Sequence, residues 1–213
     1  MQIVRSAVHQ LLPKTVSPRR LIFGLAKGCR ANIDFRYDAA FYFGRHEPHL
    51  FPHYRRLLKP GMRCFDIGMY RGWDALNLSY LTGGKTISFD GNPDCLEMTK
   101  QFIEPSGLDI TLVNAYLTSR ADGSLSMDRA SAKYGRPDFI KMDVEGAEAD
   151  ILRGATETLT DRVLLIVETH GEVVESECVG ILRQFGYNIS VVERSRIFSE
   201  SRSLSHNRWL ICS

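Results

Sequence analysis

Short apolar segments alternate with longer segments of helical periodicity over most of the chain, from Met62 onward. Strands are predicted at residues 63–67, 86–90, 109–113, 138–143 and 163–169, and helices at 72–81, 94–103, 148–159 and 173–185. A strand followed by a helix and a second strand forms a parallel pair with a right-handed crossover. The alternation therefore predicts an α/β fold built on a parallel sheet.

Two further strands, near 187–194 and 207–212, have no helix between them and should pair antiparallel. The full prediction is a doubly wound, mostly parallel seven-stranded sheet that ends in an antiparallel strand pair. Residues 1–60 are predicted to form an N-terminal extension that caps the site, and 61–213 the ligand-binding domain. Within that extension we expect helices at 3–12 and 47–59 and a short hairpin in Ala31–Tyr37, while the serines at 195–205 indicate a loop.

Composition narrows the class of protein. A length of 213 residues suits one α/β domain, and the net charge of +2 counts against a dedicated nucleic-acid binder. The five cysteines are widely spread without a C-x-x-C pair, so neither a disulfide framework nor a zinc knuckle is indicated. No apolar run is long enough to span a membrane, and the first twenty residues do not resemble a signal peptide. We therefore expect a protein of the reducing cytoplasm.

A glycine turn follows the first predicted strand of the parallel sheet. Gly68 and Gly72 leave the backbone open to a ligand, with Met69 and Tyr70 between them, and a helix follows. The pattern is D-x-G-x-x-x-G and not the G-x-G-x-x-G of dinucleotide folds. Asp66 would repel a pyrophosphate but suits a cation such as S-adenosylmethionine (SAM), which carries a sulfonium and an ammonium.

A second group of polar residues follows the next two strands. Asp90 ends the second strand, where a carboxylate accepts both hydrogen bonds of a ribose diol. Gly91 and Asn92 come directly after it, and Asn114 and Ala115 follow the third strand, within reach of an adenine edge. These residues predict a site for a nucleoside, but they do not distinguish whether the ligand is NAD or SAM.

A third segment, Asp138 to Glu148, is the most specific string of the chain. Asp143 and Glu145 come at the carboxyl end of its strand, and Lys141 shares a strand face with Asp143. Glu148 has a structural explanation, because an acid in the first turn of a helix is favoured by the helix dipole. Asp143 has none, so it is a candidate site residue.

The string Ile140 to Glu148 resembles the signature of the FkbM family of SAM-dependent methyltransferases. Further motifs occur in the order of that family, over roughly residues 24–212: Asp66-x-Gly68-x-x-x-Gly72, the acid Asp90, Asn114-Ala115, Met127-Asp128, Glu168-x-His170 and Asn207-x-Trp209. The stretch from Tyr42 to Pro48 resembles the Gly-x-Tyr-Glu-Pro entry of the family. Two positions depart from it: Met69-Tyr70 stands where Ala-Asn is common, and Asp90 where glutamate is common.

The resemblance implies a Rossmann-like class I methyltransferase fold and methyl transfer from SAM, usually to an oxygen of a sugar, glycolipid or polyketide-like acceptor. The cofactor would contact the glycine turn, the nucleoside residues and Asp143. Glu47, Tyr42 and Glu145 are the candidate acceptor-binding residues. The expected partner is a small molecule or saccharide, not a nucleic acid, and a homodimer is left open.

The strand 163–169 is predicted to lie beside the one that ends at Asp143, so Glu168 and His170 should converge with Asp143 beside the methyl group. His170 is the candidate general base, because its unperturbed pKa lies near neutrality. Glu168 would orient His170 or hold an acceptor hydroxyl. Two carboxylates and an imidazole also suit a divalent metal, although no metal ligand is predicted from the sequence.

Two other functions fit parts of the pattern. An NAD-type oxidoreductase would use the same architecture, but the missing G-x-G-x-x-G and the presence of Asp66 count against it. A binding or scaffold protein that keeps the fold without catalysis is favoured only by the departure at Met69 and Tyr70.

Overall fold

A computed structural model describes residues 13, 15–120, 124–193 and 207–213 of the chain. The helix expected at 3–12 and the loop expected at 195–205 lie outside these residues. No helix of the described residues is long and apolar enough to cross a bilayer. The five cysteines are all buried with free thiols.

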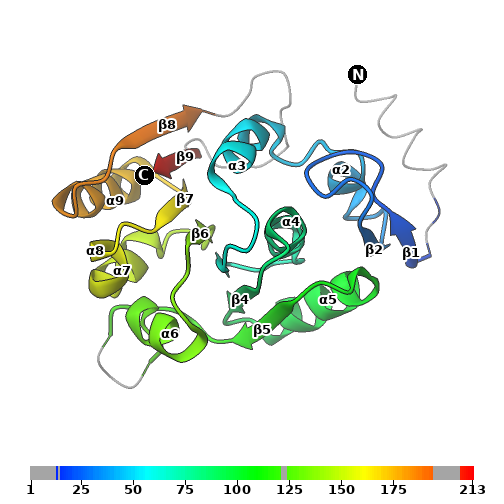
Figure 1. Ribbon diagram of the computed structural model, residues 1–213, viewed down its shortest axis with the longest axis horizontal. Helices are drawn as coiled ribbons and strands as arrows, with labels where there is room; N and C mark the ends of the chain where they lie inside the picture. Colours follow the sequence, from blue (N-terminus) through cyan, green and yellow to red (C-terminus); the bar gives the residue numbers. More distant parts are fainter. Residues whose placement is uncertain (1–12, 14, 121–123, 194–206) are drawn as a thin grey trace.

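A seven-stranded sheet forms the centre of the molecule (Figure 1), in the order β5-β4-β3-β6-β7-β9-β8. Its strands are β3 (Cys64–Ile67), β4 (Thr86–Asp90), β5 (Ile110–Asn114), β6 (Phe139–Met142), β7 (Leu164–Thr169), β8 (Ile189–Glu193) and β9 (Arg208–Cys212). Strands β3 to β7 pair in parallel. Strand β9 lies between β7 and β8 and runs antiparallel to both. This confirms the predicted α/β sheet and its antiparallel end. The strand order reverses between β3 and β6, where open sheets of this kind bind ligands.

Helices cover both faces of the sheet because each strand buries side chains on alternate sides. Cys64 of β3 lies in one core and Phe65 in the other. The first face is covered by α3 (Phe51–Leu57), α4 (Trp73–Thr82) and α5 (Pro93–Ile103). The second is covered by α6 (Met127–Tyr134), α7 (Glu148–Arg153), α8 (Thr156–Thr160) and α9 (Glu172–Gln184). A 3-10 turn, η2 (Glu104–Ser106), follows α5.

Two helix predictions need correction. The single helix expected at 148–159 is two helices, because Gly154 ends α7 and the Asp128 carboxylate accepts from the backbone of Glu157 and Thr158 at the start of α8. Helix α6 was not predicted at all. The sequence does indicate its start, because Ser126 is an N-cap residue whose side chain accepts a hydrogen bond from a backbone amide of the first turn.

The segment before β3 contains β1 (Ser17–Arg20), β2 (Arg30–Ile33), α2 (Ala39–Tyr42) and η1 (Pro48–Leu50). A hairpin is present, but the prediction that it lies in Ala31–Tyr37 is wrong, since β1 pairs with β2. The chain turns after β2 because the backbone oxygen of Asp34 accepts from Tyr37 and Asp38. The buried Asp38 carboxylate then accepts from Arg71 and from the Trp73 indole, which fixes this segment to the glycine turn.

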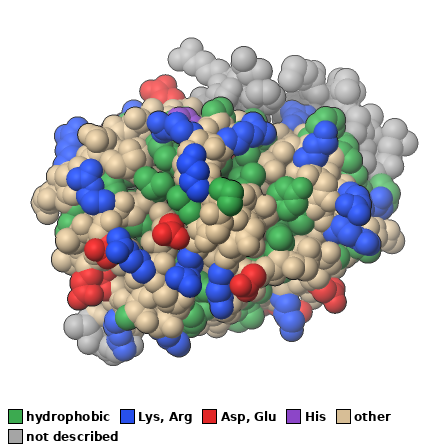
Figure 2. Space-filling model, in the orientation of Figure 1, with side chains coloured by type: hydrophobic (Ala, Val, Ile, Leu, Met, Phe, Trp, Pro, Cys, Tyr) green, Lys and Arg blue, Asp and Glu red, His purple; other side chains and the backbone are tan. Residues whose placement is uncertain are grey.

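On the face of the molecule shown in Figure 2, lysine and arginine side chains are spread over the surface with acidic side chains among them. This mixed pattern agrees with the small net charge of +2.

Candidate functional site

The candidate site lies at the carboxyl ends of β3, β4, β6 and β7. Here the glycine turn after β3 runs directly beside the end of β6. Gly68 has φ +94, and a Cβ at this position would overlap the carbonyl oxygen of Asp143. Gly72 has φ +82, and a Cβ there would meet the Thr99 side chain at 2.5 Å. Gly68 is therefore required by the close approach of the Asp143 backbone and Gly72 by the close approach of the Thr99 side chain, and both by their positive φ.

The two residues between the glycines differ in their surroundings. Met69 is buried, whereas Tyr70 is 53% exposed and has φ +42. Asparagine tolerates this left-handed region better than tyrosine. The Tyr70 amide donates to Asp90 Oδ2 at 3.3 Å, and its carbonyl accepts from the Thr99 hydroxyl at 3.1 Å. These two bonds hold the turn in its strained conformation.

The predicted nucleoside residues come together beside this turn. Asp90 Oδ1 accepts from the Asn92 amide at 2.8 Å, and the Asp90 carbonyl accepts from the Asn114 side chain and the Ala115 amide. Gly91 is covered by the ring of Tyr116, which is 73% exposed. Sequence reasoning missed Tyr116, although it directly follows Asn114-Ala115. An exposed aromatic ring at this position can stack on a base.

Asp66 lies inside β3, within the strand predicted at 63–67. Its side chain is buried, and its Oδ2 accepts from the Ser88 hydroxyl of β4 at 2.6 Å. Burial raises the pKa of Asp66 well above its ordinary value, and the neighbouring carboxylate of Asp74 adds to this. A cation bound next to Asp66 would favour its ionised form.

Lys141 of β6 is the central cation of the site. Its ammonium is fully buried and lies 3.7 Å from Asp74 Oδ2, 3.9 Å from Asp143 Oδ2 and 3.5 Å from Glu168 Oε2. Burial alone would lower the pKa of Lys141, but the surrounding carboxylates, including Glu47, raise it well above the ordinary value. Lys141 is therefore charged in the folded protein.

Replacing Lys141 with methionine should lower the free energy of unfolding by about 3 kcal/mol or more, because breaking a buried ion pair leaves its partners uncompensated. The measurement is urea denaturation at neutral pH with a chelator present. Lys100→Met, at an exposed position of α5, is the control and should change the value by less than about 0.5 kcal/mol. Equal stability of the two variants would show that Lys141 does not hold the carboxylates together.

Glu168 of β7 is fixed by the two late residues that the family motif singled out. The Asn207 amide donates to Glu168 Oε1 at 2.7 Å, and the Trp209 indole donates to Oε2 at 3.1 Å. Burial opposes ionisation of Glu168, yet Lys141 and the hydrogen bonds outweigh it and lower the pKa of this carboxyl. Glu168 is a fixed anion.

His170 lies at the end of β7 with its side chain 3% exposed. Its Nδ1 is 2.6 Å from Glu148 Oε1, and its Nε2 faces Asp143, Glu145 and Glu168. Burial is the largest single effect and works against the charged imidazole, but the hydrogen bond with Glu148 and the negative charges of Asp143, Glu168 and Glu148 together outweigh it and raise the pKa of His170. Burial also raises the pKa of Asp143, to about 7. The predicted convergence of Asp143, Glu168 and His170 is thus present, and Glu148 has a second role beyond the helix dipole.

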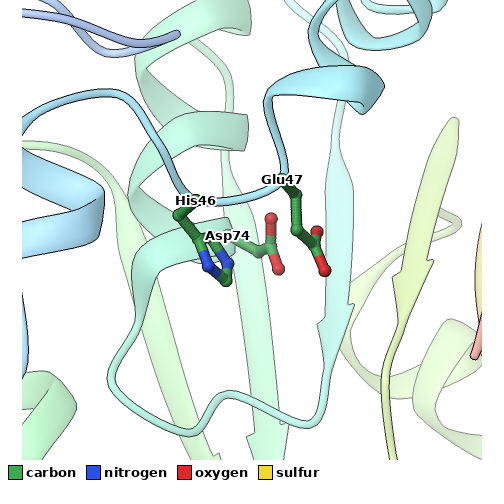
Figure 3. Close-up of side chains that lie close together, drawn as sticks. All are labelled: His46, Glu47 and Asp74. Atoms are coloured by element: carbon green, nitrogen blue, oxygen red, sulfur yellow. The ribbon is translucent and has the colours of Figure 1, made fainter. Parts of the chain in front are cut away.

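His46, Glu47 and Asp74 form a second group in which the side chains point toward one another (Figure 3). His46 and Glu47 come from the loop before η1, and Asp74 from the first turn of α4. Glu47 is buried at φ +43, a strained value for glutamate, and burial raises its pKa. Asp74 Oδ1 accepts from the Tyr54 hydroxyl at 3.0 Å. Sequence reasoning missed Asp74 because an acid in a first helical turn needs no functional explanation.

The other two candidate acceptor residues have different environments. Glu145 is 68% exposed at its side chain and has φ +53, with Oε2 3.6 Å from His170 Nε2. Tyr42 packs edge-on against Phe35 and Phe43, at ring distances of 5.0 and 5.1 Å. Glu145 therefore borders the acidic group, whereas the observed contacts of Tyr42 are packing contacts within the N-terminal segment.

Comparison with known proteins gives a family for one segment and a fold for most of the chain. Residues 118–189 match the family model described as the methyltransferase FkbM domain. This segment includes Lys141, Asp143, Glu168 and His170, and the glycine turn lies before it. A search of curated proteins found no match.

Several solved methyltransferase structures share the fold. One is precorrin-6y C5,15-methyltransferase from Geobacter metallireducens, at 16% identity over 74% of this chain and 82% of that chain, with a TM-score of 0.53. Fibrillarin from Aeropyrum pernix, with natively bound SAM, is 20% identical over 74% and 68% of the two chains, with a TM-score of 0.53. The tRNA (uracil-54, C5)-methyltransferase from Pyrococcus abyssi, with S-adenosyl-L-homocysteine, is 15% identical over 94% and 45%, with a TM-score of 0.60.

Identities this low show a common fold, so the chain has the fold of class I methyltransferases. Residues 118–189, about a third of the chain, are similar to the methyltransferase FkbM domain.

Proposed function

We propose that this protein transfers a methyl group from SAM to a hydroxyl oxygen of a sugar, glycolipid or polyketide-like acceptor. The observation that carries the proposal is the concentration of carboxylates at the carboxyl ends of β3, β6 and β7. Asp66, Asp74, Asp143 and Glu168 all lie near one charged lysine, Lys141. This excess of negative charge suits a cationic methyl donor and not an anionic dinucleotide.

In the proposed complex, SAM lies along the edge formed by the glycine turn, Asp90 and Asn114. Asp90 takes the ribose hydroxyls, Ala115 and Tyr116 border the adenine, and Asp66 provides the negative field for the ammonium. Gly72 is the N-cap of α4, and the dipole of this helix favours a negative group such as the SAM carboxylate at that end. The methyl group then faces Asp143.

The affinity for SAM should rise as the pH rises from 6 to 8. Burial raises the pKa of Asp143, which faces the methyl group, to about 7, and it also raises the pKa of Asp66. A larger share of these carboxyls is therefore neutral at the lower pH, and only the ionised form attracts a cation. Calorimetric dissociation constants should fall several-fold over this range, and the trend should be smaller in the Asp66→Asn variant, in which Asp143 still titrates. A wild-type affinity that falls with pH would contradict this role of Asp66.

The reaction itself needs an aligned acceptor and a place for its proton. The acceptor oxygen attacks the methyl carbon, the carbon–sulfur bond breaks with its electron pair on sulfur, and S-adenosylhomocysteine leaves. The hydroxyl proton passes to the group formed by Asp143, Glu168 and His170. Alignment provides most of the acceleration, since SAM carries a good leaving group. Glu47 and Glu145 are proposed to hold the acceptor by its other hydroxyls.

We propose that the segment before residue 61 closes over the acceptor. Two contacts support this role. Glu47 reaches the buried carboxylates from this segment, and Asp38 holds Arg71 of the glycine turn at 2.8 Å. The acceptor would then lie between Glu47 and the ends of β6 and β7.

The test is a transfer assay with methyl-labelled SAM and a panel of hydroxylated saccharides, glycolipids and polyketides. The expected result is label bound through oxygen in one acceptor class, with equal release of S-adenosylhomocysteine. Label on nitrogen or carbon would overturn the oxygen assignment. Tight SAM binding without transfer to any member of a broad panel would favour the non-catalytic alternative.

A further inference from the structure

We propose that Asp143, Glu168 and His170 bind one divalent metal ion, with Glu148 holding the imidazole in place. The site deepens the proposed function, because it lies where the acceptor hydroxyl would meet the methyl group. The argument uses the spacing of the ligand atoms, two buried atoms that lack hydrogen-bond partners, and the contacts of the residues behind them.

The spacing around His170 Nε2 is that of ligands sharing one ion. This nitrogen is 3.4 Å from Asp143 Oδ1 and 3.7 Å from Glu168 Oε1, and Glu145 Oε2 lies 3.6 Å away on the open side. These distances are longer than the donor–acceptor distance of a normal N–H···O hydrogen bond. Two atoms that each lie about 2.1 Å from a metal ion in tetrahedral geometry are about 3.4 Å apart. A single ion would therefore reach all of these atoms with small adjustments.

Two of the same atoms are left without hydrogen bonds. Both His170 Nε2 and Asp143 Oδ1 are buried and have no hydrogen-bond partner in the described part of the chain. The imidazole side chain is only 3% exposed, so bulk water does not compensate it. A buried polar atom without a partner is costly, and an ion between these two atoms would satisfy both.

The residues behind the ligands orient them as in known metal centres. Glu148 Oε1 lies 2.6 Å from His170 Nδ1 and also accepts from the Gly146 amide. A proton on Nδ1 directs the Nε2 lone pair at the carboxylates, which is the usual arrangement of a metal-binding histidine with a carboxylate behind it. Glu168 is likewise fixed by Asn207 and Trp209.

The group His46, Glu47 and Asp74 is the alternative position for an ion (Figure 3). Each group contains one carboxylate with both oxygens engaged: Asp74 by Tyr54 and Lys141, and Glu168 by Asn207 and Trp209. The group at His170 fits better because its Nε2 and Asp143 Oδ1 both lack hydrogen-bond partners among the described residues, and because Glu148 holds the imidazole from behind. His46 therefore offers a matched control for His170.

The types of ligand indicate which metal ions would bind here and how a bound ion would act on the acceptor. Imidazole with carboxylates suits Mn²⁺, Fe²⁺ or Zn²⁺, and the carboxylates also accept Mg²⁺. An ion here would bind the acceptor hydroxyl oxygen and lower the pKa of that hydroxyl. Asp143, Glu168 and His170 would then act through the ion as its ligands, and the acceptor proton would pass to water on the open side of the site, beside Glu145.

The experiment is a Mn²⁺ titration of chelator-treated protein, followed by the electron paramagnetic resonance signal of free Mn²⁺. We expect saturable binding of one Mn²⁺ per chain, competed by Mg²⁺ or Zn²⁺. His170→Ala and Asp143→Asn should each weaken binding at least tenfold, and Glu148→Gln by about 10- to 100-fold. His46→Ala should stay within twofold of the wild type. Circular dichroism identifies any variant that has lost its fold, and Glu148→Gln changes shape least.

Three results would overturn the metal site. They are no saturable Mn²⁺ binding by the folded wild type, equal binding by the folded His170→Ala and Glu148→Gln variants, or loss of binding in His46→Ala. SAM affinity is measured on the same samples without metal. Methyl transfer that is unchanged by chelator, with no Mn²⁺ binding, would remove the metal site and keep the proposed function. Mn²⁺ binding by a protein that binds no SAM would keep the metal site and remove the proposed function.

Discussion

The Gly68→Ala variant should lose measurable SAM binding while remaining folded. A Cβ at position 68 overlaps the backbone carbonyl of Asp143, which no side-chain rotation can relieve, and φ is +94. Either the glycine turn or the end of β6 must move, and both border the proposed cofactor position. A shift of this kind should raise the dissociation constant of SAM at least 100-fold. Calorimetric titration of SAM into the variant measures the change.

The control for this substitution is Gly107→Ala. Gly107 also has a positive φ, of +67, but its Cβ would meet no atom within 4 Å. Both variants carry the backbone strain of alanine in the left-handed region, about 1–2 kcal/mol. Only Gly68→Ala carries the overlap, so SAM affinity should be unchanged in Gly107→Ala. SAM binding by Gly68→Ala within threefold of the wild type would show that the turn does not form the cofactor site.

The second large effect is on turnover. Asp143→Asn and His170→Ala should each lower kcat by about 10²–10⁴-fold, the range for removal of a group that handles the acceptor proton. The same loss is expected whether these residues take the proton directly or hold an ion that binds the acceptor oxygen. The measurement is the initial rate with methyl-labelled SAM and the acceptor found in the panel.

Asp161→Asn is the control for these variants, because Asp161 pairs with Arg136 at the surface and both side chains are about half exposed. Its kcat should lie within twofold of the wild type. Thermal unfolding shows whether each variant remains folded at the assay temperature. Full activity in both Asp143→Asn and His170→Ala would remove this group from the mechanism.

The sequence predicted the sheet well because its signals are local and strong. The apolar segments that became β3 to β7 are bounded by glycines and charged residues, and their alternation with helices leaves few topologies. The hairpin was placed wrongly because its first strand, Ser17–Arg20, is half exposed and mostly polar or proline. Helix α6 was missed because only Met127 and Ala130 are buried along its eight residues.

The site was predicted in part for similar reasons. Asp143 and His170 directly follow β6 and β7, and Glu168 lies near the carboxyl end of β7, so parallel topology alone brings them together. The partners that fix them are distant in the sequence, and no spacing rule connects Glu148 to His170 or Asp74 to Lys141. The hydrogen bond between Asp66 and Ser88 likewise joins two strands, so the sequence pattern alone does not predict it.

The most direct test of the central claim is calorimetric titration of the purified protein with SAM, with S-adenosylhomocysteine and, as a control, with NAD. The structure predicts one site for SAM and for S-adenosylhomocysteine, with dissociation constants in the micromolar range that weaken in Asp66→Ala, and no heat of binding with NAD. Binding of NAD without SAM, or binding of none of the three, would contradict the assignment of this edge of the sheet as a SAM site.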